Sequence, residues 1–177
     1  MVANVRRPCL LVLILLVMLS GTACEDTTPT PEEQAAVETA VRGYLDALAE
    51  SYSTLNVGPL VGYASPNEIA TVKKLLTTLA RSTNDRVDSE LIGFEVEAMS
   101  IFRQVNATVR LIEVWDVTRY ELTTGRVKGR NPTSLQTSIL QLRRIEGAWI
   151  VIGRTVTVQE IEEQPTPVEI VEEDGDG

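Results

Sequence analysis

The sequence predicts an α+β domain in which three N-terminal helices pack on a strongly curved, four-stranded antiparallel sheet. The first indication is the order of elements, since three helix-like segments precede four segments rich in β-branched and aromatic residues. The second is the stretch 107–122, whose 16 residues without Gly or Pro exceed the usual strand length. The third is an apparent change of apolar phase within that stretch, which predicts a bulge and a sharp bend.

The first helix is predicted from its N-terminal signals. Thr30 is a suitable N-cap, Pro31 suits the first helical position, and Glu33 completes a capping box. The helix is expected to end near Ser51. Its apolar face is expected to hold Val37, Val41, Tyr44 and Leu48.

Two further helices are expected before the sheet. The segment 55–64 predicts a helix of one to two turns, with Leu60 and Tyr63 facing inward. A third helix is predicted over 66–81, because Ser65 and Glu68 repeat the capping-box pattern.

Four strands are predicted at 90–102, 107–122, 134–145 and 149–158, the last two joined by a tight turn at 146–147. The last strand has apolar residues in both phases, which predicts a central strand or one covered on both faces. The first strand is expected to turn one face to the core, formed by Ile92, Phe94, Val96 and Ala98.

Residues 1–23 have the layout of a secretory signal peptide. Arg6 and Arg7 precede an apolar run of 11 residues, 9–19, and small residues follow up to position 23. A run of that length is short for a hydrocarbon core of about 30 Å. Ordinary secretory cleavage after residue 23 and an uncleaved anchor both remain alternatives to a lipid-modified N-terminus.

The stretch 19–24 resembles the lipobox of bacterial lipoproteins, with Gly21 where that pattern usually has Leu. The resemblance implies that Cys24 is acylated with diacylglycerol and becomes the mature N-terminus. The protein is then expected to be exported and anchored on the outer side of the bacterial cytoplasmic membrane or cell envelope.

The flanks of the domain differ from it in composition. Residues 24–34 form a Pro- and Thr-rich linker, 35–158 are assigned to the domain, and 159–177 form a tail predicted to be disordered. The tail has eight acidic side chains and no basic one, whereas 36–158 hold 14 basic and 13 acidic residues. The tail is therefore expected to screen the basic half of the sheet through salt-sensitive contacts.

Histidine is absent, and the two cysteines are Cys9 and Cys24. This composition excludes a His/Cys zinc site of the usual kind and excludes catalytic machinery of the Ser-His-Asp or Cys-His type. No metal and no cofactor are expected.

The order of elements resembles the nuclear transport factor 2-like superfamily over about 36–158. The specific similarities are the helix 35–51, with its stretch Tyr44–Leu48, and the closing hairpin Leu142–Trp149. The resemblance implies a cone, in which a curved sheet wraps round its helices and often encloses an apolar pocket. Members include isomerases, dehydratases and binding domains without catalysis, so the resemblance concerns the fold more than the activity.

Asp116 is the one candidate for a catalytic residue. If it faces a pocket, burial would raise the pKa of its carboxyl group and make it a general base. Ketosteroid isomerase-like members combine such a base with a tyrosine donor, and Tyr44, Tyr63 and Tyr120 are available. The alternative is a solvent-facing Asp116 paired with a cross-strand arginine.

The preferred function is a non-catalytic binding or assembly module, tethered at the cell envelope. Its partner is expected to be another envelope protein or a small apolar ligand, and not nucleic acid; the alternative is an isomerase- or dehydratase-like enzyme using Asp116 and a tyrosine. Trp149 is expected in the core. The candidate ligand- or partner-binding residues, which would otherwise form a solvated face, are Trp115, Arg119, Tyr120, Arg126, Lys128 and Arg130.

Overall fold

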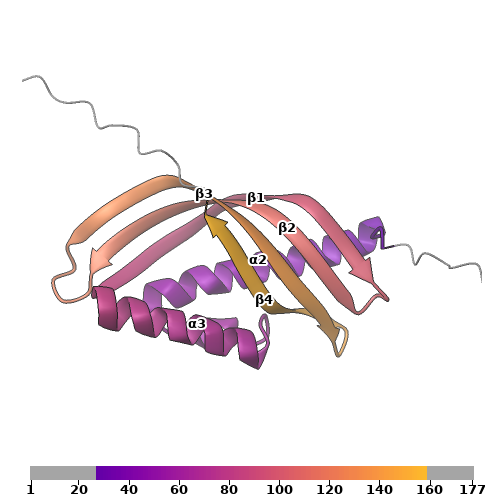
Figure 1. Cartoon of the computed structure of the whole chain (residues 1–177), viewed down its shortest axis with the longest axis horizontal. Helices are drawn as coiled ribbons and strands as arrows, with labels where there is room; N and C mark the ends of the chain where they lie inside the picture. Colours follow the sequence, from indigo (N-terminus) through magenta and orange to yellow (C-terminus); the bar gives the residue numbers. More distant parts are fainter. Residues whose placement is uncertain (1–26, 159–177) are drawn as a thin grey trace, which may run out of the picture.

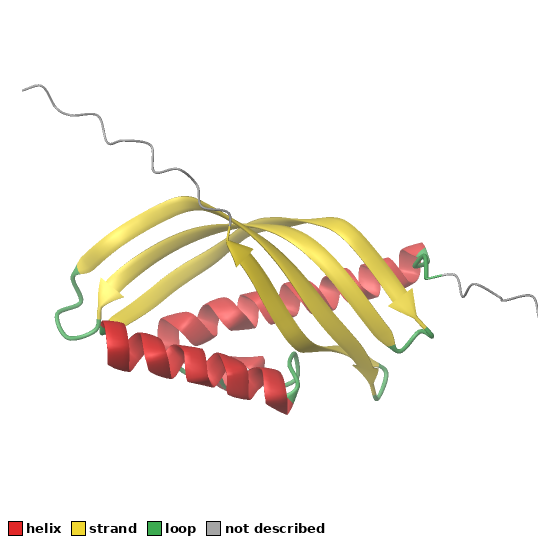
Figure 2. Ribbon diagram, viewed as in Figure 1, coloured by secondary structure: helices red, strands yellow, loops and turns green. Residues whose placement is uncertain are grey.

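A computed structural model describes residues 27–158, and shows a curved sheet arching over two α-helices (Figures 1 and 2). The predicted signal peptide, Cys24 and the acidic tail lie outside these residues. Four antiparallel strands pair in chain order: β1 (Asp85–Phe102), β2 (Asn106–Glu121), β3 (Val127–Ile145) and β4 (Ala148–Val158). Within 27–158, no helix combines the length and apolar character needed to cross a membrane.

The long helix α2 (Pro31–Thr54) begins with the predicted capping box. The Glu33 backbone N–H donates to Thr30 Oγ1 at 3.2 Å, and the Thr30 N–H donates to Glu33 Oε2 at 3.0 Å. The helix therefore starts inside the range assigned to the linker. Its buried residues include all four that were expected on its apolar face, Val37, Val41, Tyr44 and Leu48.

Only two α-helices are present among residues 27–158, so the prediction of three was wrong. The segment 55–64 forms a single 3₁₀ turn, η1 (Gly58–Leu60). Gly58 and Pro59 disfavour a longer helix, and Gly62 has a left-handed φ of +94°. Leu60 is buried as expected, whereas Tyr63 is 43% exposed and lies against Gly43.

Helix α3 (Pro66–Thr78) is followed by a π-helical turn, η2 (Leu79–Thr83). Its N-cap Ser65 accepts the Glu68 N–H at 3.3 Å, but only this half of the predicted capping box forms. The Glu68 carboxylate is buried and accepts the Tyr44 hydroxyl at 2.7 Å. The Glu68 carboxylate therefore binds the buried Tyr44 hydroxyl instead of capping the start of α3.

Tight turns connect β1 to β2 and β3 to β4. Arg103 and Gln104 both have positive φ angles, and so do Glu146 and Gly147. Two consecutive left-handed residues match the twist of the flanking strands. The tight turn predicted at 146–147 is confirmed.

Two register shifts interrupt the pairing of β1 with β2, at Ile92 and at Glu97. Each adds one residue to β1, which bends the strand and reverses which residues face inward. Phe94 and Val96 pack against the core as expected, but Ile92 is 58% exposed and Ala98 is also exposed. The predicted inward face of this strand was therefore half wrong.

Strand β2 alternates without the predicted change of phase. Its buried residues are every second one from the start of the strand: Ala107, Val109, Leu111, Glu113 and Trp115. The apolar Ile112 and Val114 lie on the opposite, outer face and are partly exposed. The inward position between Leu111 and Trp115 is occupied by the charged Glu113, which is fully buried.

Strand β4 was predicted to be central or covered on both faces; it lies at the edge of the sheet, so the central position was wrong. A register shift between Gln141 and Leu142 leaves Ile152 as an extra residue on β4. The shift explains the apolar residues in both phases, because Trp149 and Val151 are inward before it and Arg154 is inward after it. Because β1 and β4 do not pair with each other, the sheet is strongly curved but not closed into a cone.

The core fills the space between the concave face of the sheet and the helices. Helix α2 packs against β1 and β4, and α3 packs against β4. The largest fully buried side chains include Tyr44, Leu45, Leu60, Leu111, Leu140 and Leu142. Two carboxylates, those of Glu113 and Asp85, are also fully buried.

Candidate functional site

Glu113 is fully buried on the concave face and accepts hydrogen bonds from three side chains. Trp115 Nε1 donates to its Oε2 at 2.9 Å, and Arg154 Nη2 donates to the same oxygen at 2.6 Å. Ser138 Oγ donates to Oε1. The three donors come from β2, β3 and β4, so the carboxylate ties three strands together.

The alternation of side chains along the strands places Glu113 and its donors on the concave face. Glu113 and Trp115 are two residues apart on β2 and therefore share a face. Arg154 faces the same side because Ile152 is an extra residue on β4; a regular strand would have turned Gly153 inward instead. The Arg154 side chain is 11% exposed, and its Nε is buried without a partner among the described residues.

A cavity of about 180 Å³ lies beside this cluster, between the second half of α2 and the concave face. Most of its lining is apolar. Five lining residues carry polar side-chain groups. Those of Trp115 and Arg154 are bonded to Glu113, whereas the side chains of Tyr52, Ser89 and Gln136 make no hydrogen bond within residues 27–158. The full lining is Leu48, Ala49, Tyr52, Val87, Ser89, Trp115, Val117, Gln136 and Arg154.

Both tyrosines near the cavity are neutral hydrogen-bond donors at ordinary pH. Burial raises the pKa of the Tyr44 hydroxyl far above its usual range, and its bond to Glu68 adds to this effect. Burial also raises the pKa of Tyr52, and the charge of Arg154 partly offsets the shift. The Tyr44 hydroxyl is used by Glu68, which leaves Tyr52 as the free phenolic donor.

Asp116 lies on the outer face of the sheet, away from the cavity. Arg130 Nη2 donates to its Oδ2 at 2.6 Å, and Arg130 Nε donates to Oδ1 at 3.2 Å. This pairing holds the pKa of the Asp116 carboxyl below its ordinary value. Asp116, Tyr120 and Arg130 line one open polar hollow of about 500 Å³.

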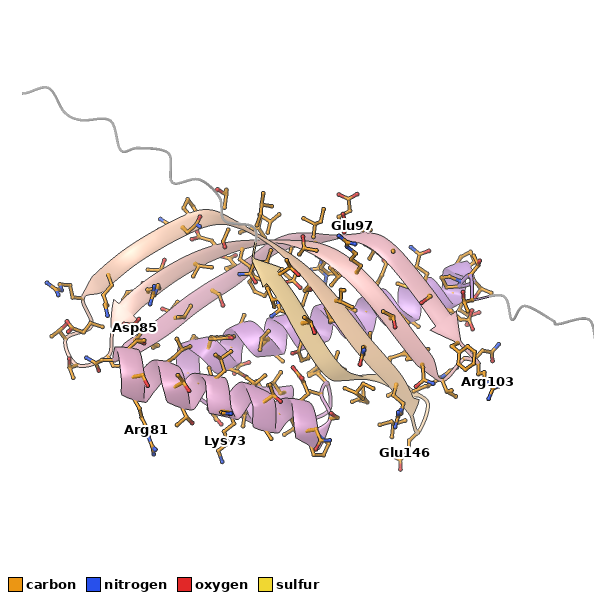
Figure 3. The ribbon with its side chains drawn as sticks, in the orientation of Figure 1. Lys73, Arg81, Asp85, Glu97, Arg103 and Glu146 are labelled. Carbon is orange, nitrogen blue, oxygen red and sulfur yellow. The ribbon has the colours of Figure 1, made fainter. Side chains whose placement is uncertain are left out.

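The other candidate residues are spread over two further sites. Arg119 and Lys128 both bind the buried Asp85, at 2.6 and 2.5 Å, where η2 meets β1 (Figure 3). Their hydrogen bonds, that of Lys128 foremost, lower the pKa of Asp85. Arg126 lies 3.7 Å from Glu121, and only Trp115 of the six candidates lines the inner cavity.

Sequence reasoning missed Glu113 and Arg154. A signal for Glu113 was available, because it occupies an inward position between Leu111 and Trp115 in an otherwise apolar series. No comparable signal marked Arg154, because its orientation depends on an extra residue in β4 that the sequence does not reveal. Among residues 27–158, no three Cys, Asp or Glu side chains are grouped as metal ligands would be.

Comparison with known proteins gives likeness of fold only. No family model and no curated protein matches the sequence. The intermembrane space region of the chloroplast protein ARC6 aligns with a TM-score of 0.60 and 10% identity, over 74% of this chain and 100% of that chain.

A ketosteroid isomerase-like protein from Erwinia carotovora atroseptica aligns with a TM-score of 0.51 and 15% identity, over 73% of this chain and 98% of that chain. Identities this low say nothing of activity. The two alignments cover nearly the whole of each neighbour and show a likeness of overall fold. Residues 27–158 therefore have the nuclear transport factor 2-like fold that the sequence resemblance implied.

Proposed function

We propose that this domain is a non-catalytic binding module whose inner cavity takes a small, uncharged, single-ring molecule. The observation that carries the proposal is an apolar cavity lined by three polar side chains without partners, those of Tyr52, Ser89 and Gln136. Ligand sites typically combine apolar walls with a few polar groups of this kind. An apolar cavity of about 150 Å³ binds benzene, so about 180 Å³ suits a ligand with one ring.

Charge balance favours a neutral ligand. Arg154, the only cation in the lining, is already paired with Glu113, so the cavity offers no uncompensated positive charge to an anion. The Tyr52 hydroxyl is protonated and can donate to a carbonyl or ether oxygen. The expected ligand is therefore mostly apolar with one hydrogen-bond acceptor.

The buried polar groups argue against catalysis. Three donors occupy the Glu113 oxygens, and a general base must be able to take a proton from its substrate. The catalytic alternative relies on Asp116 and a tyrosine, but Asp116 is held by two hydrogen bonds from Arg130 in the outer hollow. A carboxylate bound in this way is a weak base.

Binding is tested with two ligands of equal shape, acetophenone and α-methylstyrene, which differ in a carbonyl oxygen and a methylene group. Trp115 lines the cavity, so its fluorescence reports occupancy once Trp149 is replaced by Phe. We expect saturable binding of both ligands and several-fold tighter binding of acetophenone. Tyr52→Phe should weaken that preference, since it removes the phenolic donor and little volume and leaves only Ser89 and Gln136 as unpartnered donors.

The matched control for this experiment is Ala49→Leu, which fills the cavity from α2 without touching the polar cluster. It should abolish binding of both ligands while the chain still unfolds cooperatively. Saturable binding that is unchanged in Ala49→Leu would mean that the ligands bind elsewhere, and this would refute the proposed site.

We propose further that the module is exported and tethered through a lipid on Cys24, as the lipobox-like stretch 19–24 suggests. Cys24→Ser should release the protein from membranes or leave its precursor uncleaved, because the thiol carries the lipid. Mass spectrometry of the mature N-terminus decides between the readings. An unmodified Cys24 at the N-terminus would instead indicate ordinary secretion.

A further inference from the structure

Most basic residues of the sheet already form ion pairs with carboxylates; the exceptions are Arg143 and Arg144 near the end of β3, which bond an amide oxygen and a backbone carbonyl. Besides the pair of Arg86 with Asp88, six cations of the sheet and its connections each form an ion pair, so the tail has few unpaired cations to screen there. The pairs are Arg110 with Glu97, Arg119 and Lys128 with Asp85, Arg126 with Glu121, Arg130 with Asp116, and Arg154 with Glu113.

Three other cations form a separate group on α3 and η2. Within residues 27–158, the side chains of Lys73, Lys74 and Arg81 make no hydrogen bond, ion pair or ring contact. Figure 3 shows Lys73 and Arg81 pointing away from the sheet. The only acid on α3 is Glu68, which is buried against Tyr44.

We propose that the acidic segment 159–177 of the same chain docks on this outer face of α3 and η2. The segment carries eight acidic side chains and no basic one, and the face carries three cations and no exposed acid. The proposal relocates the contact expected for the tail from the sheet to the helix. It is independent of the ligand cavity.

The course of the chain places the segment near that face. The segment follows β4, which is the edge strand next to α3. The start of α3 is joined to β4 by the hydrogen bond from the Ser65 N–H to the Val151 carbonyl, at 2.8 Å. Further along, Thr155 of β4 lines one hollow together with Asn67 and Thr71 of α3. The 19 residues of the segment can extend about 60 Å, so every cation lies within reach.

A tethered partner needs little affinity. A short flexible connection gives an effective concentration in the millimolar range, so individually weak surface contacts are sufficient for substantial occupancy. The contacts are between exposed charges and are screened at high ionic strength. The docked state should therefore be populated at low salt and lost at about 1 M salt, where the Debye length is about 3 Å.

The test uses the chain from residue 24 to 177 with Cys24→Ser and a single nitroxide label on Gly175→Cys. At low salt, we expect paramagnetic broadening of backbone amides in α3 and η2, and its loss at high salt. Lys73→Gln/Lys74→Gln should reduce the broadening at least several-fold. Glutamine keeps a good helix propensity, so these substitutions should leave α3 intact.

The matched control is Arg143→Gln/Arg144→Gln, which removes two cations from the other end of the molecule and should leave the broadening unchanged. Broadening centred on β3 near 126–130, no broadening at low salt, or equal broadening after Lys73→Gln/Lys74→Gln would each overturn the proposal. So would binding to phosphatidylglycerol vesicles that depends on Lys73 and Lys74 but is unaffected by Glu160→Gln/Glu162→Gln/Glu163→Gln. That result would make a membrane the occupant of this face.

Discussion

Replacing Arg154 by methionine should lower the free energy of unfolding by about 3–5 kcal/mol. Glu113 is fully buried and Arg154 is 11% exposed, so the substitution leaves a carboxylate in the interior without its cation. The remaining donors, Trp115 and Ser138, are neutral and compensate only in part. Urea denaturation followed by circular dichroism measures the loss.

A double substitution separates the ion pair from packing. Arg154→Met combined with Glu113→Leu removes both charges, and replacing a buried pair by apolar residues is often close to neutral. We expect the double variant to be clearly more stable than Arg154→Met. The exposed pair of Arg130 with Asp116 is the control, and Arg130→Met should have a much smaller effect. Additive losses at positions 113 and 154 would show that the two residues are not coupled.

Trp149→Ala should cost about 3–5 kcal/mol, since it removes a large aromatic side chain from the core. Trp149 is 8% exposed and packs in the apolar cluster on the concave face. Urea denaturation should show this loss as a lower midpoint concentration of urea, with a similar dependence of the unfolding free energy on urea concentration. Phe102→Ala, at a residue that is 43% exposed, provides a control and should cost far less. A negligible loss for Trp149→Ala would contradict the inward orientation of this residue.

Much of the architecture could be predicted because local signals and tertiary structure agree. Three segments each specify one local structure: the capping box at Thr30, the left-handed pair Glu146–Gly147, and the segment 107–122, which is rich in β-branched residues and has no Gly or Pro. The first and third strands were predicted too short. β3 starts at Val127 and includes Gly129 and Pro132, which usually break strands but are tolerated where the outer edge has no partner.

The candidate site was harder to predict, because it depends on where the pairing is irregular. Glu113 was missed because the apolar Ile112 and Val114 were interpreted as a change of phase, although both lie on the outer face. Ile92, Glu97 and Ile152 are extra residues whose positions follow from pairing with a neighbouring strand, and single-strand periodicity does not reveal them. Trp115 was the exception, since it was expected to face a pocket or a partner and does line the cavity.

The bond between Glu113 and Arg154 also bears on how the chain chooses among competing strand alignments. Sliding β4 by one residue against β3 would turn Arg154 to solvent and leave Glu113 inside with two neutral donors. Apolar residues discriminate poorly against such a slip in this strand, because Ile150 and Ile152 could replace Trp149 and Val151 on the inner face. The buried ion pair has no such substitute, because no other cation of β4 could take the place of Arg154 beside Glu113. We therefore expect its main contribution to be the selection of one alignment, so that removing both charges should yield a stable chain with more than one arrangement of its last strand.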